Sequence, residues 1–349
     1  MFRYRNIFRT WLMRKKLRSR WLWISIFFSI IVLVIVLATT VDETTIVYLS
    51  RMDPYFLLIA FGLRVLALGV WAFKIQKMAE SLGYRVPFLY CLNTVNANLF
   101  AGAITPAQAG GEPVRIHELY AAKVKLGDAT ALVITERILD AIILIIAGII
   151  AVSFIGAMNL SSIVRMGIYL AWGSMLAVVI LFIYSAHRPD LLKRLLKRGV
   201  GCIAKKWDAT RVQDTCERID REVDNFHASL TLFATKGRGG LAWGSVCTAA
   251  FWSLEFLVPS FLLLGLGEKP YFAESFLLQI VIAIIMMVPT TPGGSGVAEV
   301  SAYSLYALLI KSSIAGVFVV LWRALFYYFN IALGLLASIP ILQREIHED

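Results

Sequence analysis

The sequence predicts an all-α membrane protein: a polytopic helical bundle with two re-entrant (broken) helical hairpins in an inverted repeat. Three observations predict this fold. The 349 residues are 59% hydrophobic and only 16% charged, whereas soluble domains average about 45–50% apolar and about 25% charged residues. Apolar runs long enough to cross a bilayer, about 20 residues each, recur along the chain. Two further apolar stretches are interrupted by proline and glycine at similar places.

The chain begins with a basic segment, residues 1–20, in which eight positions are Lys or Arg, and an apolar run at 21–41 follows. A signal peptide has a shorter apolar region of about 7–15 residues and a small-residue cleavage site. We therefore expect an uncleaved first span with a cytoplasmic N-terminus, since basic segments stay on the cytoplasmic side.

Five more apolar runs bring the expected number of full spans to about six, and they lie at 54–73, 130–152, 166–184, 241–264 and 314–339. Lys74, Lys77 and Arg85 follow the second span and mark its cytoplasmic end. The net charge of +11 fits cytoplasmic loops near anionic lipid. We expect a multi-pass protein of the cell membrane with the tail, 341–349, also in the cytoplasm, and no nucleic-acid partner.

The stretches 86–124 and 271–311 do not form simple spans. The first is broken by Pro106, Gly110, Gly111 and Pro113, and the second by Pro289, Pro292, Gly293, Gly294 and Gly296. Irregular backbone at membrane depth is stable only inside protein or beside a wet cavity. This pattern favours two re-entrant hairpins, and the alternative is two ordinary loops between shorter spans.

The two breaks also resemble each other. In each, a proline and a glycine-containing break precede a glutamate and then Leu-Tyr-Ala, at 119–121 and at 305–307. Seventeen residues beyond each tyrosine lies an arginine, Arg137 or Arg323. Three predicted spans separate the hairpins, so the hairpins would enter from opposite faces. Broken helices in such inverted repeats commonly form a substrate site near the midplane.

A polar segment, 185–240, separates a first membrane half (21–184) from a second (241–340). Apolar residues recur every three or four positions from Val212 to Phe233, which predicts an amphipathic cytoplasmic helix. We expect its apolar stripe to pack on the membrane surface or on the rest of the protein. The alternative is contact with a partner subunit or a second copy through 208–235.

Charges inside apolar runs are the candidate functional residues, because each costs at least about 2.5–3.5 kcal/mol near the bilayer centre. They are Arg64, Glu136, Arg137, Asp140, Glu255 and Arg323. Arg137 and Asp140 are three apart and can pair. In one interpretation, such ion pairs fix helix register. In the other, Arg137 and Arg323 converge in a water-accessible hollow and bind a phosphate headgroup, which guanidinium grips bidentately.

Residues around the breaks complete the candidate site. Glu112 and Glu299 could take up a proton, bind a cationic headgroup or pair with arginine, and Arg115 could pair with Glu112 or meet a phosphate. Helix N-termini after the breaks would add amide donors. The expected substrate-binding residues are Arg137, Arg323, Glu112, Arg115, Glu136, Asp140, Glu299, Pro106, Gly110, Gly111, Pro292, Gly293 and Gly294.

No motif indicates a metal, a nucleotide or a disulfide framework. The four cysteines and four histidines are scattered, and neither glycine-rich break matches a phosphate-loop pattern. We expect no metal, no cofactor and no enzymatic activity. Two alternatives stay open: a membrane-embedded enzyme acting on a lipid-linked substrate with Glu136 and Asp140, and a non-catalytic assembly subunit.

Segments 93–120 and 289–299, together with Thr135-Glu136-Arg137 and Asp140, resemble the lysylphosphatidylglycerol synthase transmembrane region, a flippase-like family. The resemblance covers about residues 21–340, although Ser295 stands where a bulkier apolar residue is expected. In well-known members this region moves an aminoacylated lipid between leaflets and is fused to an aminoacyl-transferase domain, which these 349 residues lack.

The resemblance implies a flippase- or scramblase-like lipid translocase. Its substrate would be a phosphate-containing lipid, such as an (aminoacyl-)phospholipid or a polyprenyl-phosphate-linked lipid. Its partners would be membrane lipids with an anionic or zwitterionic headgroup.

Overall fold

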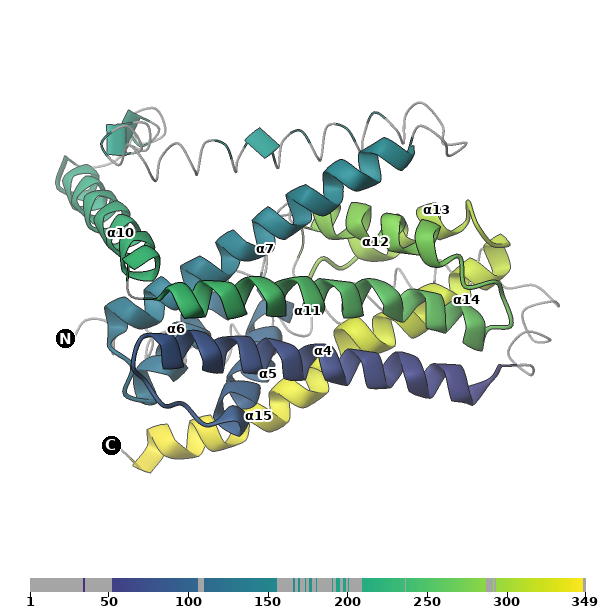
Figure 1. The fold of residues 1–349 in the computed structure, drawn as a ribbon, viewed down its shortest axis with the longest axis horizontal. Coiled ribbons are helices and arrows are strands. Elements are labelled where there is room, and N and C mark those ends of the chain that lie inside the picture. The colour runs from purple at the N-terminus through teal and green to yellow at the C-terminus, as the bar shows by residue number, and fades with distance from the viewer. Residues whose placement is uncertain are drawn as a thin grey trace. The chain divides into compact units, whose positions relative to one another are not determined.

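The computed structural model describes residues 52–105, 110–155, 209–235, 237–286, 291 and 293–347, together with single positions at 34 and between 166 and 200. Within these residues the chain forms helices and no strand (Figure 1), which confirms the all-α prediction. The predicted span 21–41 and most of 166–184 lie outside them.

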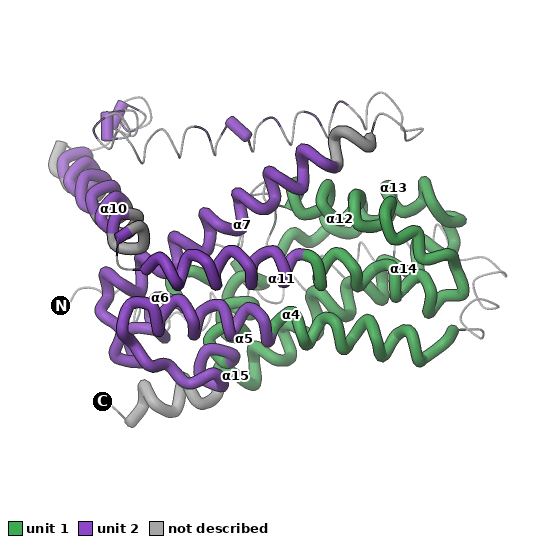
Figure 2. Tube along the Cα trace, in the orientation of Figure 1, with its two compact units in different colours: residues 1–68, 93–114, 253–349 green, residues 69–92, 115–252 purple. Residues whose placement is uncertain are grey.

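The chain divides into two compact units, shown in separate colours in Figure 2. Unit 1 comprises residues 1–68, 93–114 and 253–349, and unit 2 comprises residues 69–92 and 115–252. The boundaries fall inside helices, so several helices contribute one part to each unit. Each unit is therefore described by its own contacts below.

The helices occur in an order that repeats. The first series is α4 (Pro54–Ser81), α5 (Phe88–Ala103), α6 (Gly111–Ala121) and α7 (Leu126–Ile155). After α10 (Ala209–Thr235), the second series is α11 (Arg238–Gly265), α12 (Phe272–Met286), α13 (Val297–Tyr306), α14 (Ser312–Arg323), the π-helix η1 (Ala324–Tyr328) and α15 (Phe329–His347). In each series a helix of 28 residues precedes a short pair, of 16 and 11 residues or of 15 and 10, and a long helical segment follows.

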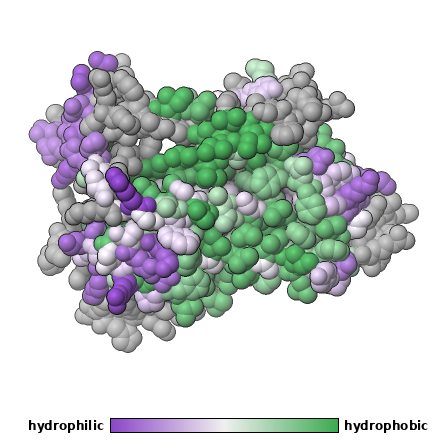
Figure 3. All heavy atoms as spheres, in the orientation of Figure 1, coloured by the Kyte–Doolittle hydropathy of each residue, from purple (hydrophilic) through white to green (hydrophobic). Residues whose placement is uncertain are grey.

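Three helices in the described part of the chain are long and apolar enough to cross a membrane: Pro54–Ser81, Arg238–Gly265, and the continuous segment Ser312–Ser338. They coincide with predicted spans. Helix α7, which is not one of these three, covers the predicted span 130–152 and carries charged residues in its first half. Figure 3 shows strongly hydrophobic side chains along α7 on the visible face.

Helix α4 is longer than the predicted span 54–73, because it continues to Ser81. Apolar residues continue at helical spacing from the predicted span to beyond residue 73. The buried ones on this face are Leu68, Trp71, Ala72, Ile75, Met78 and Ala79. Lys74 is consequently a buried residue within the helix. The predicted end of this span at residue 73 was too early, since burial against neighbouring helices prolongs α4.

Both interrupted stretches form a helix, a break and a second helix. Pro106, Pro289 and Pro292 lie outside the described residues, so the breaks are defined by their flanks. In the second break Gly293, Gly294 and Gly296 have φ values of 59°, 66° and 87°. Residues with a Cβ rarely adopt this left-handed region, so the glycines allow the chain to turn between α12 and α13.

Helix α10 forms in the predicted amphipathic segment and contacts α7 within unit 2. Val223, a member of the apolar stripe, is buried. Lys193 and Lys197 form ion pairs with Asp224 and Asp220 of α10, at 2.6 and 2.7 Å. These contacts agree with the interpretation that the stripe packs on the rest of the protein.

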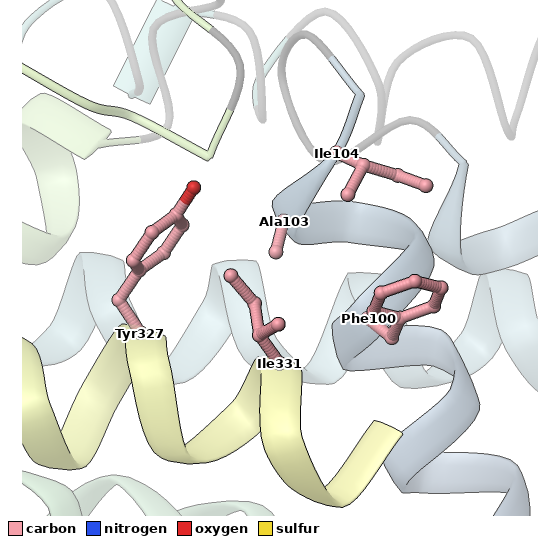
Figure 4. Close-up of a cluster of buried hydrophobic side chains, with 5 residues drawn as sticks. All are labelled: Phe100, Ala103, Ile104, Tyr327 and Ile331. Carbon is pink, nitrogen blue, oxygen red and sulfur yellow. The ribbon is translucent and has the colours of Figure 1, made fainter. Parts of the chain in front are cut away.

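One buried cluster of unit 1 joins the end of α5 to the last helical segment. Phe100, Ala103 and Ile104 pack with Tyr327 of η1 and Ile331 of α15 (Figure 4). Ile104 directly precedes the first break. The cluster therefore packs the end of α5, before that break, against the segment that follows Arg323.

Candidate functional site

The second break carries a buried ion pair between Glu299, on the first turn of α13, and Arg323, at the end of α14. Arg323 Nε lies 3.0 Å from Glu299 Oε1, and the two residues are 4% and 0% exposed. The backbone N–H of Gly296 donates to Glu299 Oε2 at 2.7 Å. Glu299 thus binds the glycine turn with one oxygen and the guanidinium with the other, and such charge-assisted contacts are stronger than neutral hydrogen bonds.

Two further contacts hold the Arg323 guanidinium. Its Nη2 donates to Ser295 Oγ at 3.2 Å, and its Cζ lies 4.0 Å from the centre of the Tyr327 ring. A cation over an aromatic face gains about 0.5–2 kcal/mol, more when desolvated. The π-helix η1 begins directly after Arg323, and such wide turns occur frequently at functional sites.

Within unit 1, Tyr327 links the end of α5 to the Glu299–Arg323 pair. Its ring contacts Arg323 at the end of α14, and it also packs in the cluster with Ala103 and Ile104, before the first break (Figure 4). The first break itself is held by Thr105, whose Oγ1 accepts from Gly110 N at 2.9 Å and donates to Ala101 O at 2.7 Å. One side chain therefore contacts both the helix before the first break and the arginine that pairs with Glu299, after the second break.

Unit 1 holds a second buried pair, Arg64 with Glu255, in continuous helices. Arg64 Nη1 donates to Glu255 Oε1, and Nη2 donates to Asn330 Oδ1 at 2.8 Å. Pro259 lies four residues beyond Glu255 in α11, so the Glu255 carbonyl lacks its usual helical donor. This pair joins α4, α11 and α15 and agrees with the interpretation that ion pairs fix register.

In unit 2, five charged residues form an alternating series, here called the ion chain: Arg115, Glu136, Lys74, Asp140 and Arg137. Arg115 Nη1 lies 2.8 Å from Glu136 Oε2, and Lys74 Nζ lies 3.3 Å from both Glu136 Oε1 and Asp140 Oδ1. Arg137 Nη1 lies 3.8 Å from Asp140 Oδ2, the pairing expected from their spacing. The ion chain links α4, α6 and α7.

Exposure increases along the ion chain. Arg115, Glu136 and Lys74 are buried, and Trp71 Nε1 donates to Glu136 Oε1 at 3.1 Å beside them. The Asp140 side chain is 12% exposed and the Arg137 side chain 42%. A partly exposed guanidinium is thus connected to a buried charge cluster.

The structure places the predicted residues in two groups. Unit 1 contains Glu299, Arg323, Gly293 and Gly294, as well as Glu112, Gly110 and Gly111 at the first break; unit 2 contains Arg115, Glu136, Arg137 and Asp140. Pro106 and Pro292 lie outside the described residues. Arg323 differs from the expectation of a water-accessible cation, because Glu299 and Tyr327 enclose it.

The matched residues of the two breaks also differ in environment. Tyr306 is fully buried and bonds to Ser275 Oγ at 2.7 Å, whereas Tyr120 is 45% exposed. Arg323 is buried, whereas the Arg137 side chain is 42% exposed. Residues that match in the sequence repeat therefore lie in different environments.

Sequence reasoning missed Lys74, which bonds to Thr248 Oγ1 at 3.3 Å as well as to two carboxylates. It also missed Glu118, a buried acid that accepts from Tyr90. The helical spacing of apolar residues around Lys74 was the signal from which its burial could have been predicted. No group of His, Cys, Asp and Glu suited to a metal ion occurs among the residues searched, those that the structure describes.

Comparison with known proteins agrees with these features. Residues 22–334 match the model of the lysylphosphatidylglycerol synthase TM region. A UPF0104 membrane protein of Archaeoglobus fulgidus is 31% identical over 323 residues, which are 89% of this chain and 94% of the relative.

UPF0104 membrane proteins of Pyrococcus horikoshii and Methanocaldococcus jannaschii are 24% and 25% identical, over 84% and 85% of this chain and 89% and 88% of theirs. With its apolar helices and this match along nearly its whole length, the chain is a multi-pass membrane protein that belongs to the lysylphosphatidylglycerol synthase TM region family.

Proposed function

We propose that this protein is a lipid translocase, flippase- or scramblase-like, that moves a phosphate-containing lipid between membrane leaflets. The headgroup passes the two breaks while the tails remain in lipid. The substrate is an (aminoacyl-)phospholipid or a polyprenyl-phosphate-linked lipid, with an anionic or zwitterionic headgroup, and the protein itself catalyses no bond change. Both termini lie in the cytoplasm of a cell-membrane protein.

The observation that carries this proposal is the position of Tyr327, which packs on the end of α5 before the first break and contacts Arg323, the buried partner of Glu299 after the second break. In this proposal the two short helix pairs are re-entrant hairpins that enter from opposite faces. Discontinuous helices of this kind bind substrate in transporters built from inverted repeats. Charges inside a membrane normally serve such pathways, because their insertion is costly.

The family supports the class of substrate. Its description names a synthase of lysylphosphatidylglycerol, whose headgroup carries a phosphate. Arginine suits that headgroup because its planar fork binds phosphate oxygens in pairs. Arg137 is the partly exposed arginine of the ion chain, so we assign it the first contact with the headgroup.

Reconstitution in liposomes tests the proposal. Fluorescent phosphatidylglycerol and polyprenyl-phosphate probes in the inner leaflet should become accessible to an external quencher in vesicles with the protein, and far more slowly in empty vesicles. Transfer at the rate of empty vesicles, with folded protein verified by circular dichroism, would contradict the proposal.

A matched pair of variants tests the role of Arg137. Arg137→Gln should slow the transfer several-fold, because the entering phosphate loses its cation. Lys77→Gln is the control, since Lys77 is also partly exposed and pairs with an acid three residues away, Glu80, at 2.6 Å. Equal rates in the two variants would remove Arg137 from the pathway.

A further inference from the structure

Glu299 occupies an anion site made by its neighbours. A guanidinium (Arg323 Nε, 3.0 Å) and a backbone N–H (Gly296, 2.7 Å) meet its two oxygens, and Ser295 Oγ adjoins the same guanidinium. Guanidinium, amide and hydroxyl groups together are the set that binds phosphate oxygens in proteins. The carboxylate is thus a resident anion in a site whose chemistry also fits a phosphate.

The two buried pairs of unit 1 differ in how firmly the acid is held. Glu255 lies in the middle of α11, and its partner Arg64 is also held by Asn330. Glu299 lies on the first turn of a helix of 10 residues, directly after a turn with three positive-φ glycines. A short helix after a glycine turn can shift without breaking a long helix, so Glu299 can leave its site at lower cost.

We propose that the substrate phosphate displaces Glu299 from Arg323, an exchange of one anion for another that opens the second break. This inference rests on the proposed function and adds its mechanism. Exchange avoids a bare buried guanidinium, which would be strongly destabilising. Displacement of Glu299 also releases the Gly296 N–H, so binding of the headgroup and movement of the glycine turn are one event.

Ligand binding to the purified full-length protein in detergent tests the exchange without any transport assay. The probes are dihexanoyl phosphatidate, inorganic phosphate and dihexanoylglycerol, which lacks phosphate. Glu299→Gln should bind phosphatidate at least about tenfold more tightly than the native protein, because the resident anion is removed. Glu255→Gln is the matched control and should bind with native affinity, although it also loses the acid of a buried pair.

Two more variants keep the test decisive. The double variant Glu299→Gln with Arg323→Gln is balanced in charge and should lose phosphatidate binding. Glu299→Asp retains the charge but shortens its reach, so it should also bind more tightly than the native protein, and it serves if Glu299→Gln does not fold. Dihexanoylglycerol should not bind.

The outcomes separate the alternatives. Equal affinity in Glu299→Gln and Glu255→Gln, or weaker binding in Glu299→Gln than in the native protein, overturns the exchange. Tight binding of inorganic phosphate, with none of phosphatidate, retains the anion site but overturns a lipid occupant. Transfer in liposomes by a protein that binds no phosphatidate overturns the exchange alone, whereas binding without transfer overturns the proposed function.

Discussion

Glu136 accepts contacts from three donors on two helices: Trp71 Nε1 at 3.1 Å and Lys74 Nζ at 3.3 Å on α4, and Arg115 Nη1 at 2.8 Å on α6. It is fully buried. Two cations share this carboxylate, so its removal would leave positive charges in a region without water. Buried pairs of this kind are weak evidence for net stability, but loss of one partner is costly.

We predict that Glu136→Gln lowers the free energy of unfolding by about 3–5 kcal/mol, the usual effect of breaking a buried ion pair. The thermal unfolding midpoint, measured in detergent by tryptophan fluorescence, should fall clearly. Glu80→Gln is the control: Glu80 forms an exposed pair with Lys77, and exposed pairs contribute about 0–1 kcal/mol. Equal midpoints would contradict a stabilising role of the Glu136 carboxylate in the ion chain.

Tyr84, in the connection after α4, donates its hydroxyl hydrogen to Asp128 Oδ2 at 2.5 Å. This hydrogen bond to a carboxylate raises the pKa of Tyr84 above its ordinary value of 10.0. The protonated phenol is the stabilising form, so its contribution is complete below the pKa of unfolded tyrosine, about 10, and is lost as the pH rises through the higher folded value.

An absorbance titration of phenolate, with Tyr84→Phe as the reference, should therefore show Tyr84 ionising above pH 10 or so. Asp128→Asn should lower the pKa of Tyr84, because the amide does not carry the negative charge that opposes ionisation. An unchanged titration in Asp128→Asn would mean that the hydrogen bond does not persist in solution.

Single residues show which ion pairs the sequence predicts and which it does not. The spacing of Arg137 and Asp140 on one helix predicted their approach, because i,i+3 neighbours lie on one face. The pairs Arg64–Glu255 and Arg115–Glu136 are 191 and 21 residues apart, and no local pattern specifies such partners. Tertiary packing selected them.

At the scale of the element, irregular helical turns coincide with buried charge. The π-helix η1 follows Arg323 at once, and Pro259 removes the helical donor to the carbonyl of Glu255. Both features loosen regular hydrogen bonding next to an ion pair. Irregular helical backbone therefore lies beside the buried pairs Arg64–Glu255 and Glu299–Arg323.

Helix α15 approaches α5 very closely at Gly334. A Cβ at this position would meet Phe100 and lie 2.6 Å from the backbone oxygen of Asn96. We predict that Gly334→Ala destabilises the protein by about 1–3 kcal/mol, the range for overpacking. The matched control is Gly62→Ala in α4, where a Cβ would meet nothing within 4 Å, and alanine should be neutral or stabilising by about 0.5–1 kcal/mol.

Thermal unfolding midpoints of both variants measure the difference. If Gly334→Ala is as stable as Gly62→Ala, the two helices do not pack as closely in solution as this structure has them. Transport should also decline in Gly334→Ala, because α5 leads into the first break and α15 follows Arg323.

Element boundaries follow the local signals to different degrees. Proline and glycine predicted both breaks, because these residues interrupt helices wherever they occur in quantity. The end of α4 was placed too early, because Lys74 looked like a loop residue although the apolar spacing continued to Ala79. Charge alone is therefore a poor helix terminator in a protein whose interior holds ion pairs.

For the molecule as a whole, two series of helices carry similar lengths but different chemistry. Each series has a broken pair between long helices, yet the matched arginine is buried in one and has a side chain that is 42% exposed in the other. The proposed function gives these arginines different tasks, with Arg137 at the entry of a headgroup and Arg323 in a conformational step. The sequence repeat predicted the repeated order of helices, whereas burial distinguishes the two arginines.

Transport by alternating access requires the flanks of the two breaks to separate, because a site opens to one side by movement of one repeat against the other. Ala103 and Ile331 lie in the cluster that packs the end of α5, before the first break, against η1 and α15 in unit 1. Tyr327 of this cluster contacts Arg323, the partner of Glu299 after the second break. We predict that Ala103→Cys with Ile331→Cys, in a background without the native cysteines, reacts with a short reducible bifunctional thiol reagent. Lipid transfer in liposomes should stop on cross-linking and return on reduction.

The control joins two helix ends remote from the breaks in sequence: Leu57→Cys with Gly265→Cys, where Leu57 adjoins Gly265 and Asp53 N donates to Gly265 O at 2.9 Å. This second cross-link binds α4 to α11, the long helices that frame the breaks, and should leave transfer at the native rate. Equal inhibition by both cross-links would mean that the frame itself must move. Full transfer with Ala103 and Ile331 joined would mean that the lipid crosses without separation of α5 from α15. The exchange at Arg323 would then have to occur while the cluster around Tyr327 stays packed.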